Sequence, residues 1–295
     1  MKLNFFIIMT MLTTLSYGCK TNGSNIHNPL LSMDNSAPKN YYTMSFSSNG
    51  CNFRIFINDV SVVDFFDTGG GAGMVPINPS ILKSGTQRLR VELYPVKGHE
   101  EKGINSIRPL DIFIKCKEGG QRLADYETVL SNPLGSVEIP VGTPYFEYEC
   151  TFEAEVPYVL QGWSNCKNLR EEPDLEEQVI KKLNELKLLF EKKKYDEITK
   201  LMLYKQNGAS YSIYRPIDKG LEEMAEMFNE MKIRYDKVAD IENYKIIFMG
   251  DGKLVYVEDI IDRDSVLRLE NDRNYWSIRV LLGKREGSDE LEVIE

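Results

Sequence analysis

The chain has 295 residues, 42% of them hydrophobic and 27% charged, so it is an ordinary globular chain with room for about two domains. Lysine and arginine total 36 against 45 aspartates and glutamates, which gives a net charge of −9. Nucleic acid is therefore a poor partner, because the chain has no basic surplus to neutralise a phosphate backbone. The acidic balance fits either plain solubility or attraction of a basic protein partner.

Residues 1–18 are typical of a secretory signal peptide. Lys2 precedes an apolar stretch over residues 3–15, which is shorter than the roughly 20 residues that cross a bilayer. Small residues Ser16 and Gly18 then lead to Cys19. No later segment is long and apolar enough to span a membrane, so the sequence predicts an exported chain that is cleaved before Cys19.

The segment around Cys19 resembles the lipobox of bacterial lipoproteins, in which the cysteine receives a lipid before cleavage. That pattern prefers Leu three residues before the cysteine and a small residue two before it, whereas this chain has Leu15 and Tyr17. Ordinary signal peptidase would cut the same bond. We expect lipidation of Cys19 and a membrane anchor of more than one acyl chain, with plain secretion as the alternative.

Composition divides the mature chain into four segments. Residues 19–40 are rich in Asn, Ser, Gly and Pro, which predicts a flexible tether. Residues 41–163 are predicted to form a first domain and residues 174–295 a second. The polar and charged residues 164–173 are predicted to be the linker between them.

Apolar and polar residues alternate along much of the first domain, which predicts short strands with one buried and one wet face. Glycine-containing turns separate these strands, as an antiparallel β-sandwich requires. The clearest strand covers residues 146–155, whose polar side is Glu147, Glu149, Thr151, Glu153 and Glu155. This row is expected to face solvent; the alternative is an acidic contact surface.

In the second domain the spacing of apolar residues changes from every second residue, as in a strand, to a period of 3.6 residues, as in a helix. Asp174 and Glu177 resemble a capping box for a first helix that begins near Leu175, a second short helix is expected to end at Asn207-Gly208, and a third begins near Pro216. Strands are then expected at residues 244–249, 253–258, 265–270, 275–282 and 290–294. This order predicts helices packed on one face of a sheet, and an α+β protein overall.

Four cysteines remain after the anchor, and they allow three disulfide pairings among which the sequence cannot choose. An oxidising periplasm favours at least one disulfide, and buried free thiols are the alternative. No spacing suggests zinc. The candidates are Cys51, Cys116, Cys150 and Cys166.

Catalytic chemistry finds little support in the sequence. The only histidines are His27 in the tether and His99 in a charged loop, and residues 68–73 are glycine-rich but lack the Lys-Ser/Thr ending of a phosphate-binding loop. Aspartates at positions 59, 64 and 67 lack the spacing of a calcium loop and are expected to be solvent-facing turn residues. We therefore predict no catalytic residue, metal or cofactor.

Several stretches of the first domain are similar in sequence to a known group of proteins. They are residues 49–53, 57–59, 76–78, 84–93, 152–158 and 162–163. In these the domain resembles the immunoglobulin-like part of Gram-negative envelope lipoproteins encoded beside secreted antibacterial toxins. The second domain resembles, in architecture only, the cystatin-like or nuclear-transport-factor-like cone fold. The resemblance implies a protein-binding lipoprotein on the periplasmic face of the outer membrane, most concretely an immunity protein that neutralises a toxin.

A second hypothesis makes the interior of the second domain a ligand site. In that case the protein would be a small-ligand carrier or an enzyme, with Arg268, Glu258 or Tyr256 reaching inward.

Overall fold

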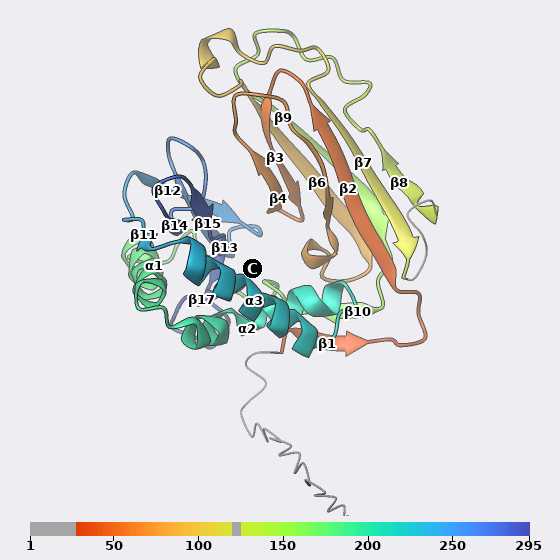
Figure 1. Cartoon of the computed structure of the whole chain (residues 1–295). Coiled ribbons are helices and arrows are strands. Elements are labelled where there is room, and N and C mark those ends of the chain that lie inside the picture. The colour runs from red at the N-terminus through yellow and green to blue at the C-terminus, as the bar shows by residue number, and fades with distance from the viewer. Residues whose placement is uncertain (1–27, 120–124) are drawn as a thin grey trace, which may run out of the picture.

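The computed structural model describes residues 28–119 and 125–295. Three helices are combined there with antiparallel strands in several sheets, which confirms the α+β class (Figure 1). The predicted signal peptide, His27 and the predicted lipidation site Cys19 lie outside the described residues. Within the ranges described, none of the helices has the length and apolar character needed to cross a membrane.

The N-terminal half, residues 28–163, contains two four-stranded antiparallel sheets that face each other across one core (Figure 1). One core wall includes Phe53, Ile55 and Leu89, and the other includes Met44 and Ile112. The first sheet has the spatial order β4 (Val60–Phe65), β3 (Asn52–Ile57), β6 (Gly85–Tyr94) and β9 (Phe146–Ala154). The second has the order β5 (Ala72–Pro76), β2 (Asn40–Ser48), β7 (Leu110–Glu118) and β8 (Glu127–Ser131).

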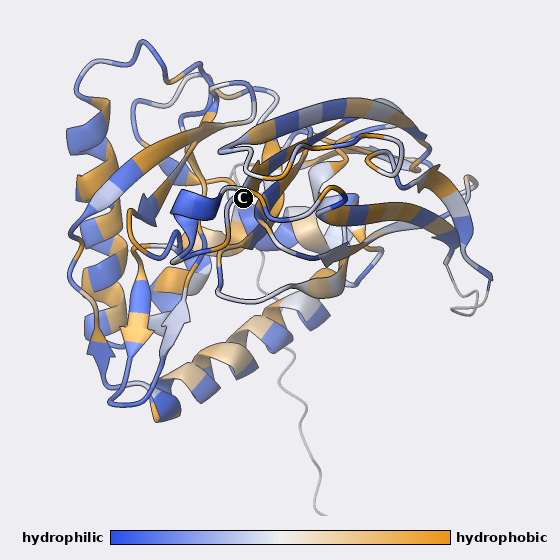
Figure 2. Ribbon diagram, turned by 90° about the horizontal axis from the view of Figure 1, so that it is seen from above, coloured by the Kyte–Doolittle hydropathy of each residue, from blue (hydrophilic) through white to orange (hydrophobic). Residues whose placement is uncertain are grey.

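The strand predicted from the glutamate row is β9, and its alternation is confirmed. Glu147, Glu149 and Glu153 are exposed, while Phe152 and Ala154 are buried. Figure 2 shows the same change of hydropathy from residue to residue along the strands of this half. In β3, however, all six residues are buried, because the C-terminal half covers the side of the strand that alternation would leave wet.

The C-terminal half, residues 164–295, packs its three helices and two small antiparallel sheets around a second core. The helices are α1 (Leu175–Glu191), α2 (Tyr195–Ser212) and α3 (Ile217–Arg234). One sheet has the order β12 (Tyr244–Met249), β13 (Leu254–Asp259), β16 (Leu282–Gly283) and β17 (Glu292–Val293). The other has the order β11 (Lys237–Val238), β14 (Arg268–Glu270) and β15 (Tyr275–Ser277).

The start of α1, the start of α3 and the turn between β12 and β13 lie where the sequence predicts them. The capping box is wrong, because Asp174 has a left-handed backbone and its side chain makes no capping hydrogen bond. The predicted end of α2 is also wrong: the helix continues through Asn207-Gly208, and Tyr211 near its end packs on the N-terminal core. The single strand expected at residues 275–282 is split between β15 and β16.

Two of the predicted segment boundaries need correction. Half of the expected tether belongs to the folded body, because β1 (Leu30–Met33) pairs with β10 (Tyr158–Leu160) and the carbonyl of Pro29 accepts a hydrogen bond from the Gln161 amide at 2.7 Å. The expected linker is packed as well, since Cys166 and Leu169 within it are buried. The segment that connects the two halves is therefore ordered chain.

Candidate functional site

Two hairpin turns, one from each half, hold the halves together. The β3–β4 turn carries Asn58 and Asp59 with positive φ, and the β12–β13 turn carries Gly250 and Asp251 with positive φ. The Gly250 amide donates to the Asp59 carbonyl at 2.9 Å, and the Asp251 amide donates to the Asp59 carboxylate at 2.8 Å. Buried apolar side chains from both halves close the contact around these turns, among them Phe56, Val60, Trp163, Met249 and Tyr256.

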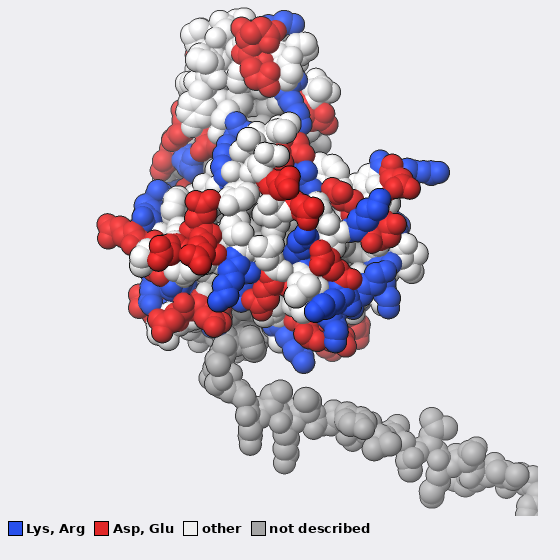
Figure 3. Space-filling model, turned by 90° about the vertical axis from the view of Figure 1, so that its left-hand side faces the viewer, with Lys and Arg blue, Asp and Glu red and all other residues white. Residues whose placement is uncertain are grey.

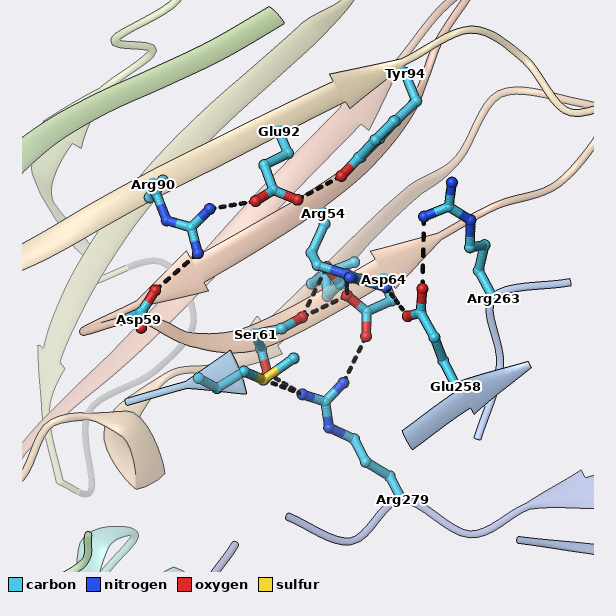
Figure 4. A network of polar contacts seen from close by, with 12 residues as sticks. Arg54, Asp59, Ser61, Asp64, Arg90, Glu92, Tyr94, Glu258, Arg263 and Arg279 are labelled. Carbon is cyan, nitrogen blue, oxygen red and sulfur yellow. Dashed lines mark hydrogen bonds and ion pairs between the residues drawn. The ribbon is translucent and has the colours of Figure 1, made fainter. Parts of the chain in front are cut away.

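Beside the turns lies a network of ion pairs that crosses between the halves (Figure 4). Arg54 of β3 donates to Asp64 of β4 at 2.6 Å and to Glu258 of β13. Arg279 from the C-terminal half donates to the second oxygen of Asp64 at 2.6 Å. The side chain of Glu258 is 0% exposed. Its carboxylate also forms ion pairs with the Lys245 ammonium at 2.9 Å and with the Arg263 guanidinium at 3.5 Å.

Charges in this network compensate one another. Burial by itself would raise the pKa of Asp64, but Arg279 and Arg54 outweigh it and hold that pKa below its usual value. Burial would likewise lower the pKa of Arg54, and Asp64 with Glu258 raises it instead. Every member of the network has an ion-pair partner, and the pairs of Arg54 with Glu258 and of Arg279 with Asp64 tie the two halves together.

Above the network the two halves enclose a groove, made of two adjoining cavities of about 370 and 320 Å³. Both cavities are lined by Phe66, Lys97 and Arg263. Ile261 also lines the first cavity, and Tyr275 lines the second. We call this region the interdomain groove.

Aromatic rings of the N-terminal half line one wall of the interdomain groove. The ring centroids of Phe66 and Tyr94 are 5.3 Å apart, and those of Tyr94 and Tyr145 are also 5.3 Å apart. The Arg263 guanidinium reaches across from the other half and lies 5.2 Å from the Phe66 centroid and 5.4 Å from the Tyr94 centroid. The Arg263 cation is thus held against two aromatic rings in the part of the lining that both cavities share.

The loop after β13 forms the opposite wall, and hydrogen bonds within it set its shape. The Asp259 carboxylate accepts the amides of Ile261 at 2.7 Å and Asp262 at 3.1 Å, and the Asp259 amide donates to the Asp264 carbonyl at 2.8 Å. Ile260 and Ile261 are nevertheless 51% and 70% exposed. Two adjacent isoleucines are thus held in solvent on an ordered loop.

Charges of both signs line the groove. Lys97 and Arg263 lie beside Asp67, Asp262 and Asp264. The Tyr275 hydroxyl donates to Asp264 at 2.8 Å, and burial together with this bond raises the pKa of Tyr275 to about 12. Figure 3 shows basic and acidic side chains interspersed on the face of the molecule that it displays, so the net charge of −9 is not gathered there.

Other residues singled out from the sequence lie apart from the groove or differ from expectation. The four candidate disulfide residues, Cys51, Cys116, Cys150 and Cys166, are free thiols. Burial raises the pKa of both Cys51 and Cys166 to about 12. Asp59, in the β3–β4 turn, and Asp64, in β4, do not face solvent as expected, because both are ion-paired with arginines and their side chains are only 18% and 14% exposed. His99 is exposed, as expected of its loop.

The residues expected to reach into a C-terminal ligand site are engaged elsewhere. Glu258 belongs to the ion-pair network, and Arg268 forms a two-pronged ion pair with Asp262 at 2.5 and 2.8 Å. Tyr256 is buried, with the Arg279 guanidinium 4.9 Å from its ring centroid. In the described part of the chain, no group of three or more His, Cys, Asp or Glu residues is placed to hold a metal ion.

Sequence reasoning missed the groove itself. Its residues come from segments more than a hundred positions apart, and no local pattern connects Phe66 and Tyr94 with Arg263. One local signal was available, the adjacent Ile260-Ile261 inside an aspartate-rich loop, where apolar residues are unexpected. Comparison of the chain with protein-family models, curated proteins and solved structures gives no match.

Proposed function

We propose that this chain is an exported lipoprotein, anchored through Cys19, that binds a protein partner in the interdomain groove. The observation that carries the proposal is the pair of exposed isoleucines on a hydrogen-bonded loop beside stacked aromatic rings and Arg263. Aromatic residues and arginine dominate the binding energy of protein interfaces, and a preordered loop loses little conformational entropy on binding. The groove therefore suits a protein surface that presents an apolar knob with polar groups around it.

The proposal includes a finer assignment of the two halves. We take the N-terminal half to be an immunoglobulin-like β-sandwich, because two four-stranded antiparallel sheets share its core. We take the C-terminal half to be a cystatin-like or nuclear-transport-factor-like domain, because three helices and short antiparallel strands surround its core. Fold alone does not assign a function, so the groove carries that part of the argument.

As its physiological role we propose immunity against a secreted antibacterial toxin, exercised without catalysis at the periplasmic face of the outer membrane. The signal-like residues 1–18 and the lipobox-like segment before Cys19 support this location. A tethered protein with a rigid binding groove would meet an incoming toxin before it reaches its target. No nucleic acid and no cofactor enter this role.

Co-culture with a toxin-secreting parent strain tests the role. We expect a strain that lacks this protein to lose viability beside the parent, and the full chain supplied in trans to restore it. A Cys19→Ser chain, which separates anchoring from binding, is expected to be released from the membrane fraction while its purified form still binds the toxin. Equal growth of the deletion strain and the parent would remove the immunity role.

A further inference from the structure

A separate cavity of about 440 Å³ lies in the C-terminal half between α2, α3 and β15, and the proposed function does not use it. Its volume falls within the range of about 300–1,000 Å³ that is usual for small-molecule sites. The apolar lining is Met202, Met224, Met227, Phe228, Met231 and Ile278. Four methionines at one cavity give walls that adapt to a flexible aliphatic ligand, because the thioether side chain is unbranched and soft.

The cavity opens to solvent at Met227 and Trp276, which are 37% and 41% exposed. Deeper lining residues are almost fully covered, as Met224 at 6% and Phe228 at 2% show. At the rim, Arg215 forms an ion pair with Glu223, so this cation is already neutralised. A ligand would therefore enter past Trp276 and meet apolar side chains inside.

Lys205 supplies a positive charge on the cavity wall. Its ammonium donates to the Arg279 carbonyl at 3.3 Å, and no carboxylate oxygen of the described residues lies within 4 Å of it. Burial lowers the pKa of Lys205, the charge of Glu295 acts in the opposite direction, and Arg279 lowers this pKa further. The ammonium thus has no carboxylate in direct contact among the described residues, and an anion bound in the cavity would supply one.

We propose that this cavity binds a small aliphatic carboxylate of the fatty-acid class, with its carboxylate at Lys205 and its hydrocarbon chain among the four methionines. The cavity and the cation together define this ligand: the walls select a hydrocarbon chain, and the ammonium selects a negative head group. Neither feature takes part in the interdomain groove. The site would thus add a lipid-responsive binding function to a protein-binding chain.

The chain contains its own reporter, because Trp276 stands at the mouth and the second tryptophan, Trp163, is 5% exposed in the contact between the halves. The experiment titrates the protein with dodecanoate below its micelle concentration and follows the tryptophan emission. Dodecanol, with the same chain and no charge, is titrated in parallel. Trp276→Phe identifies which tryptophan reports, since the emission change should vanish in that variant.

We expect a blue shift with dodecanoate and roughly tenfold weaker binding of dodecanol, which corresponds to about 1.4 kcal/mol. Lys205→Met should remove the preference for the carboxylate, Lys205→Arg should keep it, and Lys200→Met, on the exposed side of the same helix, should leave it unchanged. Equal binding of dodecanoate and dodecanol by the wild type, or no emission change from Trp276, would overturn the proposal. This comparison needs no variant, so a folding defect in Lys205→Met leaves the test intact.

Discussion

Arg54 on β3 and Glu258 on β13 lie 204 residues apart in the sequence and form an ion pair whose carboxylate is completely buried. The pair joins the two halves directly beneath the interdomain groove. Arg263, which stacks on the aromatic wall of the groove, also contacts Glu258. The geometry of the groove therefore depends on a buried carboxylate that faces away from solvent.

Glu258→Gln tests this dependence. Because removal of one partner leaves buried cations uncompensated, we expect the free energy of unfolding to fall by about 3–5 kcal/mol. Glu149→Gln, on the exposed side of β9, is the matched control and should change it by less than about 0.5 kcal/mol. Urea unfolding measures both; a loss from Glu258→Gln as small as that of the control would show that the network does not hold the halves.

The fall in the free energy of unfolding at acidic pH should depend on Asp64. The pKa of Asp64 is lower in the folded protein than its ordinary value of 3.8, so its charged form stabilises the fold above that pH and the contribution is lost as the pH falls through the lower, folded pKa. Asp64→Asn should therefore differ most from the wild type at neutral pH, and the difference should shrink below about pH 4. Unfolding measured from pH 3 to 7 checks this. A difference that stays constant over the range would contradict the shifted pKa.

Two helix glycines should respond oppositely to the same change. An added Cβ at Gly208 of α2 would lie 3.6 Å from Pro29, an ordinary contact, so Gly208→Ala should stabilise by about 0.5–1 kcal/mol through helix propensity. At Gly220 of α3 the Cβ would lie 2.3 Å from Ser210 Oγ and 2.7 Å from Gln206 Nε2, so Gly220→Ala should destabilise by about 1–3 kcal/mol. Thermal unfolding of the two variants compares them directly. Stabilisation by both would mean that the α2–α3 contact is looser than the structure has it.

Local periodicity was sufficient for the secondary structure that depends on one element and its own core. The alternation of β9 and the starts of α1 and α3 are examples, because their burial follows from their own sequence. Local periodicity was insufficient where a residue is buried by contacts from the other half of the chain. Arg54 sits on the polar side of β3 and is buried where Glu258 of the other half pairs with it.

The same reason explains the other differences. Asn207-Gly208 is a frequent helix end, yet α2 continues because Tyr211 and Tyr214 beyond it pack on the N-terminal core. Residues 28–40 are polar enough for a tether, yet β1 is held by main-chain hydrogen bonds to β10, which composition does not reveal. Contacts over long sequence separations decided each case.

The most direct test of the proposed partner binding changes the groove without changing the fold. Ile261→Asp places a charge on the exposed loop, and Ile233→Asp, on α3 at 84% exposure, places the same charge outside the groove. Both variants should keep the wild-type free energy of unfolding to within about 0.5 kcal/mol, since both side chains are solvent-exposed.

Toxin binding by the purified variants, followed by protection of the deletion strain in co-culture, is the deciding measurement. The account predicts that Ile261→Asp weakens binding by roughly tenfold or more, as expected at an interface hot spot, and loses protection, while Ile233→Asp keeps both. Wild-type binding by Ile261→Asp would contradict the assignment of the interdomain groove as the partner site.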